Sequence, residues 1–533
     1  MTNSYSGKIK PEFFSKVTES FTFYKEHKKP LDRRIIENNR WFKSRYGAYD
    51  DMECDAPTTP YLFNVIANKH ADAMDNYPEP NILERDENDR QIAETFTKII
   101  PLQLDLCGFK KTYSRAWWYK LKNGASCYGI FYNPSLCGNR GEIDIRSIDL
   151  LNMFWEPGIS DIQDSKFLFV TALCDNDSLK DKYPQYADRF SGNSALDAQT
   201  YDDSETSAND IFRDKTLVVD CYYKKQRGDI RTVEMIKFVD GTILDASEDR
   251  GDDGLYAHGL YPFVLDVLYP DENCPVGFGM VDVIKNPQMY IDRLDAIISK
   301  NAMISGKTRF MIKDNGGICE YELSDLSKDI IHVAGSVNED NIRELQARPL
   351  HQFIIQHRKN KIDELKEVSG NLDFQQGKTT GGVTAYSAIA ALQQAGEKLS
   401  RDMILESYEA YKKIICLCIE LMRQFYDEPR SYRITGNDGE CEYIRFSNRD
   451  MNETKTPAEF DVVISPEKNN PYSRITQNQT LTDLWKMGLF RKDTIDESLL
   501  ILEGLHLDGK KKLTDGLKRL ALKQNPADNP EIV

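Results

Sequence analysis

A chain of 533 residues exceeds a single hydrophobic core, so we expect about two to four domains. Hydrophobic residues make up 40% of it and charged residues 29%, which is typical of a globular protein and excludes wholesale disorder. The formal net charge of −16 argues against a protein that grips nucleic acid tightly, because that affinity comes from clustered Lys and Arg.

Cysteine and histidine usage argues against a metal site. The 11 cysteines include no pair spaced as CxxC, so we expect reduced, buried thiols and no structural zinc. Cys416 and Cys418 are close in sequence, but they fall on a predicted helix where residues i and i+2 diverge. The seven histidines do not cluster at ligand spacing. We therefore expect neither a metal nor another cofactor.

The hydropathy pattern predicts no membrane segment. Residues 1–10 are polar, so we expect no leader there. No apolar run reaches about 18 residues, the length that a membrane crossing needs. We expect assembly in a cytoplasm.

The first half of the chain predicts an α+β fold. An amphipathic helix begins near Phe13, where apolar residues recur at three- and four-residue steps, and Pro30 is expected to interrupt it. Further helices are predicted over 61–76 and 109–122. Alternating segments predict strands over 126–132, 142–148, 167–173, 216–223, 232–239 and 263–268. An acidic, serine-rich stretch, 191–210, is expected to be a surface loop.

The second half predicts long helices around a short insert. Asn286 is a suitable N-cap, with Pro287 at the first helical position, for a helix that ends at Gly306. The insert, 308–348, contains β-like segments at 309–313 and 329–333. A second helix is expected over 349–368, then a glycine-rich loop over 369–384, then a helix over 384–426 with a kink site at Gly396. Strands at 442–446 and 460–464 and helices at 475–487, 494–502 and 513–523 close the chain.

Two Gly-Lys-Thr triplets, at 306–308 and 377–379, match part of a phosphate-binding loop. That motif needs a glycine five residues before the second glycine, where this chain has Asn301 and Leu372. A chance occurrence is therefore favoured. No pair of carboxylates stands out for acid–base work either, so we expect no enzyme.

Two further clusters are interpreted as structural. The basic run 357–361, with His351 nearby, is typical of a solvated helix face, although in an oligomer it could pair with a neighbour's Asp292 and Asp295. The aromatic triplet 117–119 is expected in the core or at a subunit interface. No basic patch accompanies it, as a base-stacking platform would require.

Several stretches resemble the portal proteins of tailed bacteriophages, and their order and spacing carry the resemblance over most of the chain. They are 64–74, 124–129, 143–149, 152–157, 278–294, 368–370, 384–385 and 388–394. The resemblance implies an α+β portal fold with paired stem helices, a small α/β clip, a long kinked wing helix and a short helical crown. Its implied divisions are N-terminal wing 1–276, first stem helix 277–304, clip 305–348, second stem helix 349–368, tunnel loop 369–384, long helix and C-terminal wing 385–470, and crown 471–533.

The resemblance also implies an assembly. Portal proteins form a ring, commonly a homododecamer, at one capsid vertex, and double-stranded DNA passes through it during packaging and ejection. The implied partners are further copies of the chain, the terminase large subunit, the major capsid and scaffolding proteins and a head-tail adaptor, with no membrane. The protein would belong to the virion and assemble in the host cytoplasm. Pro287 departs from the pattern, so we expect the first stem helix to kink or begin late.

The implied tunnel loop is the candidate DNA-facing site. The residues expected to contact DNA are Gln375, Gln376, Lys378, Thr379 and Thr380. Lys378 is the only charge in 375–383, so it could touch a passing phosphate backbone without holding it, while acidic or neutral walls let DNA slide. Two alternatives stay open: another virion ring, such as a tail connector, and a phosphate-loop NTPase motor subunit.

Overall fold

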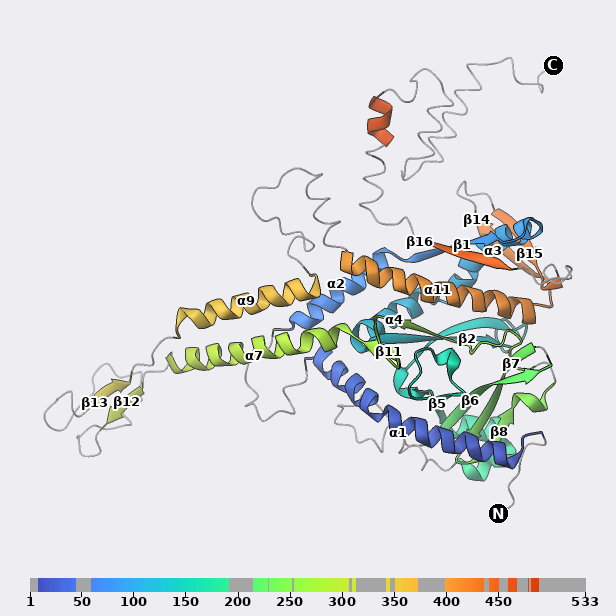
Figure 1. The fold of residues 1–533 in the computed structure, drawn as a ribbon, viewed down its shortest axis with the longest axis horizontal. Coiled ribbons are helices and arrows are strands. Elements are labelled where there is room, and N and C mark those ends of the chain that lie inside the picture. The colour runs from blue at the N-terminus through green and yellow to red at the C-terminus, as the bar shows by residue number, and fades with distance from the viewer. Residues whose placement is uncertain are drawn as a thin grey trace. The chain divides into compact units, whose positions relative to one another are not determined.

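The computed structural model describes residues 8–44, 59–190, 214–228, 230–251, 254–305, 309–312, 342–345, 350–371, 398–435, 441–449, 459–466, 478 and 481–487. The helices (Figure 1) are α1 Pro11–Phe42, α2 Tyr61–Asp75, α3 Arg90–Leu106, α4 Phe109–Asn123, α5 Asn176–Lys182, α7 Met280–Ser305, α9 Gln352–Ser369 and α11 Lys398–Phe425. The strands are β1 Pro78–Glu84, β2 Ala125–Asn133, β3 Glu142–Ile148, β4 Met153–Phe154, β5 Phe167–Asp175, β6 Lys215–Arg227, β7 Ile230–Val239, β8 Thr242–Ala246, β9 Phe263–Val267, β10 Tyr269–Asp271, β11 Cys274–Phe278, β12 Arg309–Ile312, β13 Ile342–Leu345, β14 Arg430–Thr435, β15 Cys441–Phe446 and β16 Phe460–Pro466. This mixture of helices and antiparallel strands confirms the predicted α+β class.

The chain divides into two compact units. The first draws on residues 1–35, 68–279 and 399–533, and the second on 36–67 and 280–398. The first unit contains most of the strands. The second contains α7 and α9.

The largest sheet of the first unit is antiparallel, in the order β4-β5-β6-β7-β8, and α1 lies along it (Figure 1). Phe14, Val17 and Tyr24 share one face of α1 and belong to one buried cluster with Phe169 and Phe238 of the sheet. The Phe14 ring lies 5.5 Å from that of Phe238, and the Tyr24 ring 5.8 Å from that of Phe169. The apolar periodicity seen in the sequence is therefore what docks α1 on the sheet.

Pro30 does not interrupt α1, so that expectation is wrong. The helix runs from Pro11 to Phe42 with Pro30 inside it. A proline cannot donate to the carbonyl four residues earlier, here that of Glu26. Both residues are exposed, so solvent can hydrate that carbonyl and reduce the cost of the missing bond.

A second sheet of the first unit has the order β3-β2-β9, with α4 packed against β2. The predicted hairpin is confirmed, with Ile130 of β2 paired with Ile145 of β3. Gly124 ends α4 in the left-handed region at φ 97°. A Cβ on Gly124 would lie 2.6 Å from the backbone carbonyl carbon of Phe278, so a larger residue would displace the chain there.

The remaining elements of the first unit include several that the sequence analysis did not predict. These are α3, the strand β1, which pairs with β16, and the strand β14, which pairs with β15. Pro78 and Pro80 concealed β1, because proline is disfavoured inside a sheet. They are tolerated because β1 belongs to a two-stranded sheet and needs hydrogen bonds on one side only.

In the second unit α7 packs against α9, and β12 pairs with β13 between them in the chain. The helix α7 begins at Met280, so the predicted start at Asn286 and Pro287 is wrong. Buried residues continue through the proline: Val281, Ile284, Ile291 and Leu294. Burying each is worth roughly 1.5–3 kcal/mol, which together exceeds the cost of about 3 kcal/mol for an interior proline.

Some predictions lie outside the described residues. These are the loop at 191–210, the β-segment at 329–333, the loop residues 372–384, the kink site at Gly396 and the helices at 494–502 and 513–523. Two predicted helices are described only in part. The helix predicted over 384–426 is described as α11, and the helix predicted over 475–487 is described at 481–486.

Candidate functional site

The helix α9 of the second unit is capped at both ends. His351 is the N-cap of α9, where its Nδ1 accepts a hydrogen bond from the Phe353 N–H at 3.2 Å. Gly370 ends the helix at φ 64°, and its N–H donates to the Glu367 carbonyl. Leu365 is the apolar residue of α9 that is fully buried. The expectation that His351 is only a solvated residue therefore missed its capping role.

An ion pair joins the two helices within one chain. Arg358 of α9 donates through two guanidinium nitrogens to Asp295 of α7, with the Nη2 to Oδ2 bond at 2.9 Å. Its neighbour Asp292 accepts from Gln288 Nε2 at 2.9 Å on the same helix. Arg358 of the basic run therefore has an acidic partner within its own chain, and the pairing of this run with a neighbour's acids stays a prediction. A bidentate ion pair of this kind fixes the rotation of α9 against α7.

Gln288 also joins α7 to the start of α2 within the second unit. Its Oε1 accepts from the Leu62 N–H at 3.2 Å, and its Nε2 donates to the Thr59 carbonyl at 2.9 Å. The N–H groups in the first turn of a helix have no partner inside that helix. The buried amide of Gln288 thus supplies a partner next to the proline of α7.

One edge of the helix pair carries three aromatic rings and a lysine beside them. We call it the aromatic edge, and it consists of Tyr290, Phe353, His357 and Lys361. The His357 ring stacks on Phe353 at 5.7 Å between centroids and meets the Tyr290 ring edge-on at 5.9 Å. Lys361 Nζ lies 5.7 Å from the Tyr290 ring. Phe353 is 66% exposed and Tyr290 44% exposed.

Other large apolar side chains of these helices are also exposed to solvent: Ile297, Met303, Ile355 and Val368. Single exposed apolar residues are common, but a gathering of them on one helix pair marks an interaction surface. Within the described part of the second unit, no segment covers the Phe353 ring beyond its contact with His357.

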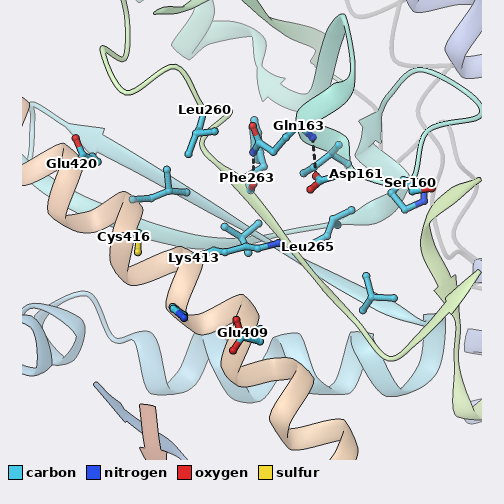
Figure 2. A pocket seen from close by; sticks show the side chains of 16 residues that line it. Ser160, Asp161, Gln163, Leu260, Phe263, Leu265, Glu409, Lys413, Cys416 and Glu420 are labelled. Atoms are coloured by element: carbon cyan, nitrogen blue, oxygen red, sulfur yellow. Dashed lines mark hydrogen bonds between the residues drawn. The ribbon is translucent and has the colours of Figure 1, made fainter. Parts of the chain in front are cut away.

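A pocket of about 480 Å³ lies in the first unit between α11 and β9 (Figure 2). Leu265 and Leu417 contribute apolar surface, while Glu409 and Lys413 lie one turn apart on α11. The Gln163 side chain is fixed at its rim, since it donates to the Phe263 carbonyl at 3.3 Å and accepts from the Tyr261 N–H at 2.9 Å. The described side chains that line this pocket include carboxylates and lysines but no histidine.

The structural readings of two sequence clusters are confirmed. Trp117 is buried, and Trp118 stacks on His70 with centroids 4.1 Å apart. On α11, Cys416 is exposed and Cys418 is buried, so the two side chains diverge as their spacing predicted, but the expectation of buried thiols is wrong for Cys416 and for Cys137, which is also exposed. The triplet at 306–308 lies outside the described residues, and the element before it is α7, a helix where a phosphate-binding loop would follow a strand.

The predicted tunnel-loop residues cannot be placed. Gln375, Gln376, Lys378, Thr379 and Thr380 lie outside the described residues. The residues that the structure describes hold no group of three or more His, Cys, Asp or Glu side chains arranged to bind a metal ion. Among the described helices, none combines the length and apolar character that a membrane crossing requires.

The described residues thus form an α+β unit and a second unit with the helix pair of α7 and α9, whose aromatic edge is exposed. The sequence matches the family model of the phage P22-like portal protein over residues 60–258 and 294–532. Because these ranges cover most of the chain, it belongs to that family, and its role is that of a phage portal, a structural component of the virion. No curated protein matches the chain.

Proposed function

We propose that copies of this chain close into a ring, commonly of twelve, at one capsid vertex, and that double-stranded DNA passes through its channel during packaging and ejection. The observation that carries this proposal is the family match over residues 60–258 and 294–532. The chain would act as a conduit, and the ATP hydrolysis that drives packaging would belong to a partner.

The exposed apolar side chains of α7 and α9 support the oligomer. A ring is built from heterologous contacts, in which one surface of a subunit meets a different surface of the next. The aromatic edge has the composition favoured at such contacts, because aromatic side chains bury a large area at low entropic cost. We assign it to the contact with a neighbouring copy.

The charge balance supports a channel that releases its cargo. With a net charge of −16, the chain has no excess of cations to hold phosphates along a channel. Gln375, Gln376, Lys378, Thr379 and Thr380 would line the channel as the tunnel loop. Their hydroxyls, amides and single ammonium make weak contacts that a moving duplex can exchange.

Different parts of the chain would bind the proposed partners. Residues 305–348 would form the clip, which receives the terminase large subunit and later the head-tail adaptor. The helices around it, 277–304 and 349–368, would form the stem. The wing, 1–276 and 385–470, and the crown, 471–533, would lie within reach of the major capsid and scaffolding proteins.

Electron microscopy of the purified full-length protein tests the ring. We expect a flanged ring with an axial hole, and a uniform population of small monomeric particles at assembly concentrations would contradict the proposal. Cross-linking tests the loop separately. A photoreactive group on a cysteine at Lys378→Cys should label packaged DNA, whereas labelling only from a cysteine at Lys359→Cys would exclude the loop as the contact.

A further inference from the structure

Ser407 of α11 lies in a buried polar cluster with Lys120 of α4 and Asp266 of β9. Lys120 Nζ donates to Ser407 Oγ and to Asp266 Oδ1, each at 2.6 Å, and Ser407 Oγ donates to Asp266 Oδ2 at 2.8 Å. Lys120 also donates to the Met403 carbonyl of the preceding turn at 3.2 Å. The side chains of Lys120 and Asp266 are 0% and 2% exposed, so these bonds, together with the Trp117 ring 4.7 Å from Lys120 Nζ, compensate for their lost hydration.

Ser400, nearer the start of α11, has the same kind of surroundings. Lys69 Nζ donates to Ser400 Oγ at 2.8 Å, and Ser400 Oγ donates to Asp72 Oδ2 at 2.8 Å. Lys69 and Asp72 lie one turn apart on α2. Burial lowers the pKa of Lys69 and raises the pKa of Asp72, which indicates that this cluster, too, is largely withdrawn from water.

Both clusters use serine for the same chemical reason. A hydroxyl can accept a hydrogen bond from an ammonium while it donates one to a carboxylate. The serine therefore bridges a lysine and an aspartate from other elements. Alanine at Ser400 would remove the shared partner of Lys69 and Asp72, and alanine at Ser407 would leave Lys120 and Asp266 in direct contact but with one hydrogen bond fewer each.

The spacing of the two serines matches the observed register. Ser400 and Ser407 are seven residues apart, so they lie on one face of α11. If α11 shifted by about one turn, the two clusters would receive Met403 and Ala410, or Ile404 and Tyr411. None of these pairs offers two short hydroxyls, so each such shift would leave Lys69 and Asp72 unbridged and would remove the hydroxyl partner from the Lys120–Asp266 pair.

We propose that Ser400 and Ser407 are positioning residues that set the register of α11 against α2, α4 and β9. The helix cannot slide along its axis or turn about it unless both bridges break. Movement of its first half therefore carries residues 68–75 of α2 together with α4 and β9. Tyr408 strengthens the connection to α2, because its hydroxyl donates to the Asn76 carbonyl at 2.8 Å.

Amide hydrogen exchange of the full-length protein tests this role. Ser407→Ala should accelerate exchange about tenfold or more at residues 400–411, with little change at 415–425, because the lost bridge frees the first half of the helix. Ser400→Ala should have a smaller effect over the same residues. It also keeps the test available if Ser407→Ala does not fold, because its cluster is less deeply buried.

Two controls separate positioning from ordinary core packing. Ile415→Val removes a methylene from the buried part of the same helix and should lower global stability without a local increase over 400–411. Ser400→Thr keeps the hydroxyl and should restore the slow exchange that Ser400→Ala loses. Unchanged exchange in both alanine variants would overturn the proposal, and so would an increase that is uniform along α11, as in the Ile415→Val control.

Discussion

The helices α11 and α9 are both long and amphipathic, but they meet different surroundings. Fourteen of the 28 residues of α11 are buried within its own chain. Of the 18 residues of α9, Leu365 and Ser369 are buried. Helices in water gain most of their stability from tertiary packing, and α9 obtains its packing within the chain from α7, with most of its remaining surface exposed. The surroundings of α11 therefore come largely from its own chain, whereas much of α9 stays exposed.

The polar side chains of α11 and α9 also differ in their surroundings. On α11 the two serines are bridged by buried lysine and aspartate side chains of the same chain. On α9 the charged residues are mostly exposed, and Arg358 makes the bonds that fix its rotation against α7. The buried polar groups of α11 thus depend on partners within the chain, whereas the exposed charges of α9 are hydrated by solvent.

The largest expected effect comes from a charge on the aromatic edge. Phe353→Asp should reduce the ring fraction at least about tenfold, because burial of an unpaired carboxylate at each subunit contact costs about 2 kcal/mol or more. Particle counts by electron microscopy and sedimentation velocity would measure the fraction. Asn360→Asp adds the same charge on α9 at an exposed position and keeps the acceptor for Gln356, so its rings should persist. Equal loss of rings in both variants would mean that charge alone, and not the aromatic edge, governs assembly.

A matched pair of truncations should separate the two helices next. Ile415→Ala in α11 should lower the free energy of unfolding of the subunit by about 3 kcal/mol, because Ile415 is fully buried. Val368→Ala in α9 should change it by less than about 0.5 kcal/mol, because Val368 is exposed. Chemical denaturation under conditions that dissociate the ring would measure both. Similar losses would contradict the division drawn between α11 and α9.

The sequence predicted those elements whose patterns are local. Apolar periodicity placed α1 and the described part of α11, a terminal glycine and a starting proline placed α4 and α9, and the turn between alternating segments placed the hairpin of β2 and β3. Proline was the recurrent source of error. Pro30 and Pro287 lie inside helices, because an exposed carbonyl in α1 and a buried apolar stripe in α7 offset their cost.

The candidate site was predicted less well, because its interactions join residues far apart in the chain. The pairing of Arg358 with Asp295 depends on the packing of α9 on α7, and sequence alone could not distinguish an intrachain from an interchain partner. The serines of α11 are inconspicuous in sequence, since Ser is common on helices. Their seven-residue spacing was visible, but the lysines and aspartates that give it meaning come from α2, α4 and β9.

The ion pair that joins the helix pair should have an intermediate effect. Arg358→Met should destabilise the second unit by about 2 kcal/mol, because it leaves the nearly buried Asp295 without its guanidinium partner. Arg358→Lys should recover part of this loss, since an ammonium supplies the charge but cannot form the bidentate pair of hydrogen bonds. Hydrogen exchange along α7 and α9 would locate the change. If Arg358→Met left exchange in both helices unaltered, the pair would have no part in fixing their rotation.

The smallest expected effect is a pH dependence confined to the first unit. Burial, with a smaller contribution from Lys224, lowers the pKa of His258 to about 4. The neutral ring accepts the Leu260 N–H on Nδ1 at 3.2 Å, and protonation there would remove that acceptor. The folded pKa lies below the unfolded value of about 6.5, so the unfolded chain binds the proton first as the pH falls. This contribution to stability is complete above about pH 6.5 and is lost as the pH falls towards 4.

Because the His258 ring is only partly buried, we expect a loss of about 1 kcal/mol over that interval. Denaturation curves at a series of pH values would measure it. His258→Asn offers an amide oxygen near the position of Nδ1 and does not titrate, so its stability should fall less over the same interval. An equally steep fall in that variant would assign the pH dependence to other groups. If acid instead accelerated amide exchange in α7 and α9 alone, the acid-sensitive element would lie in the second unit. That result would contradict the assignment of the pH dependence to the first unit.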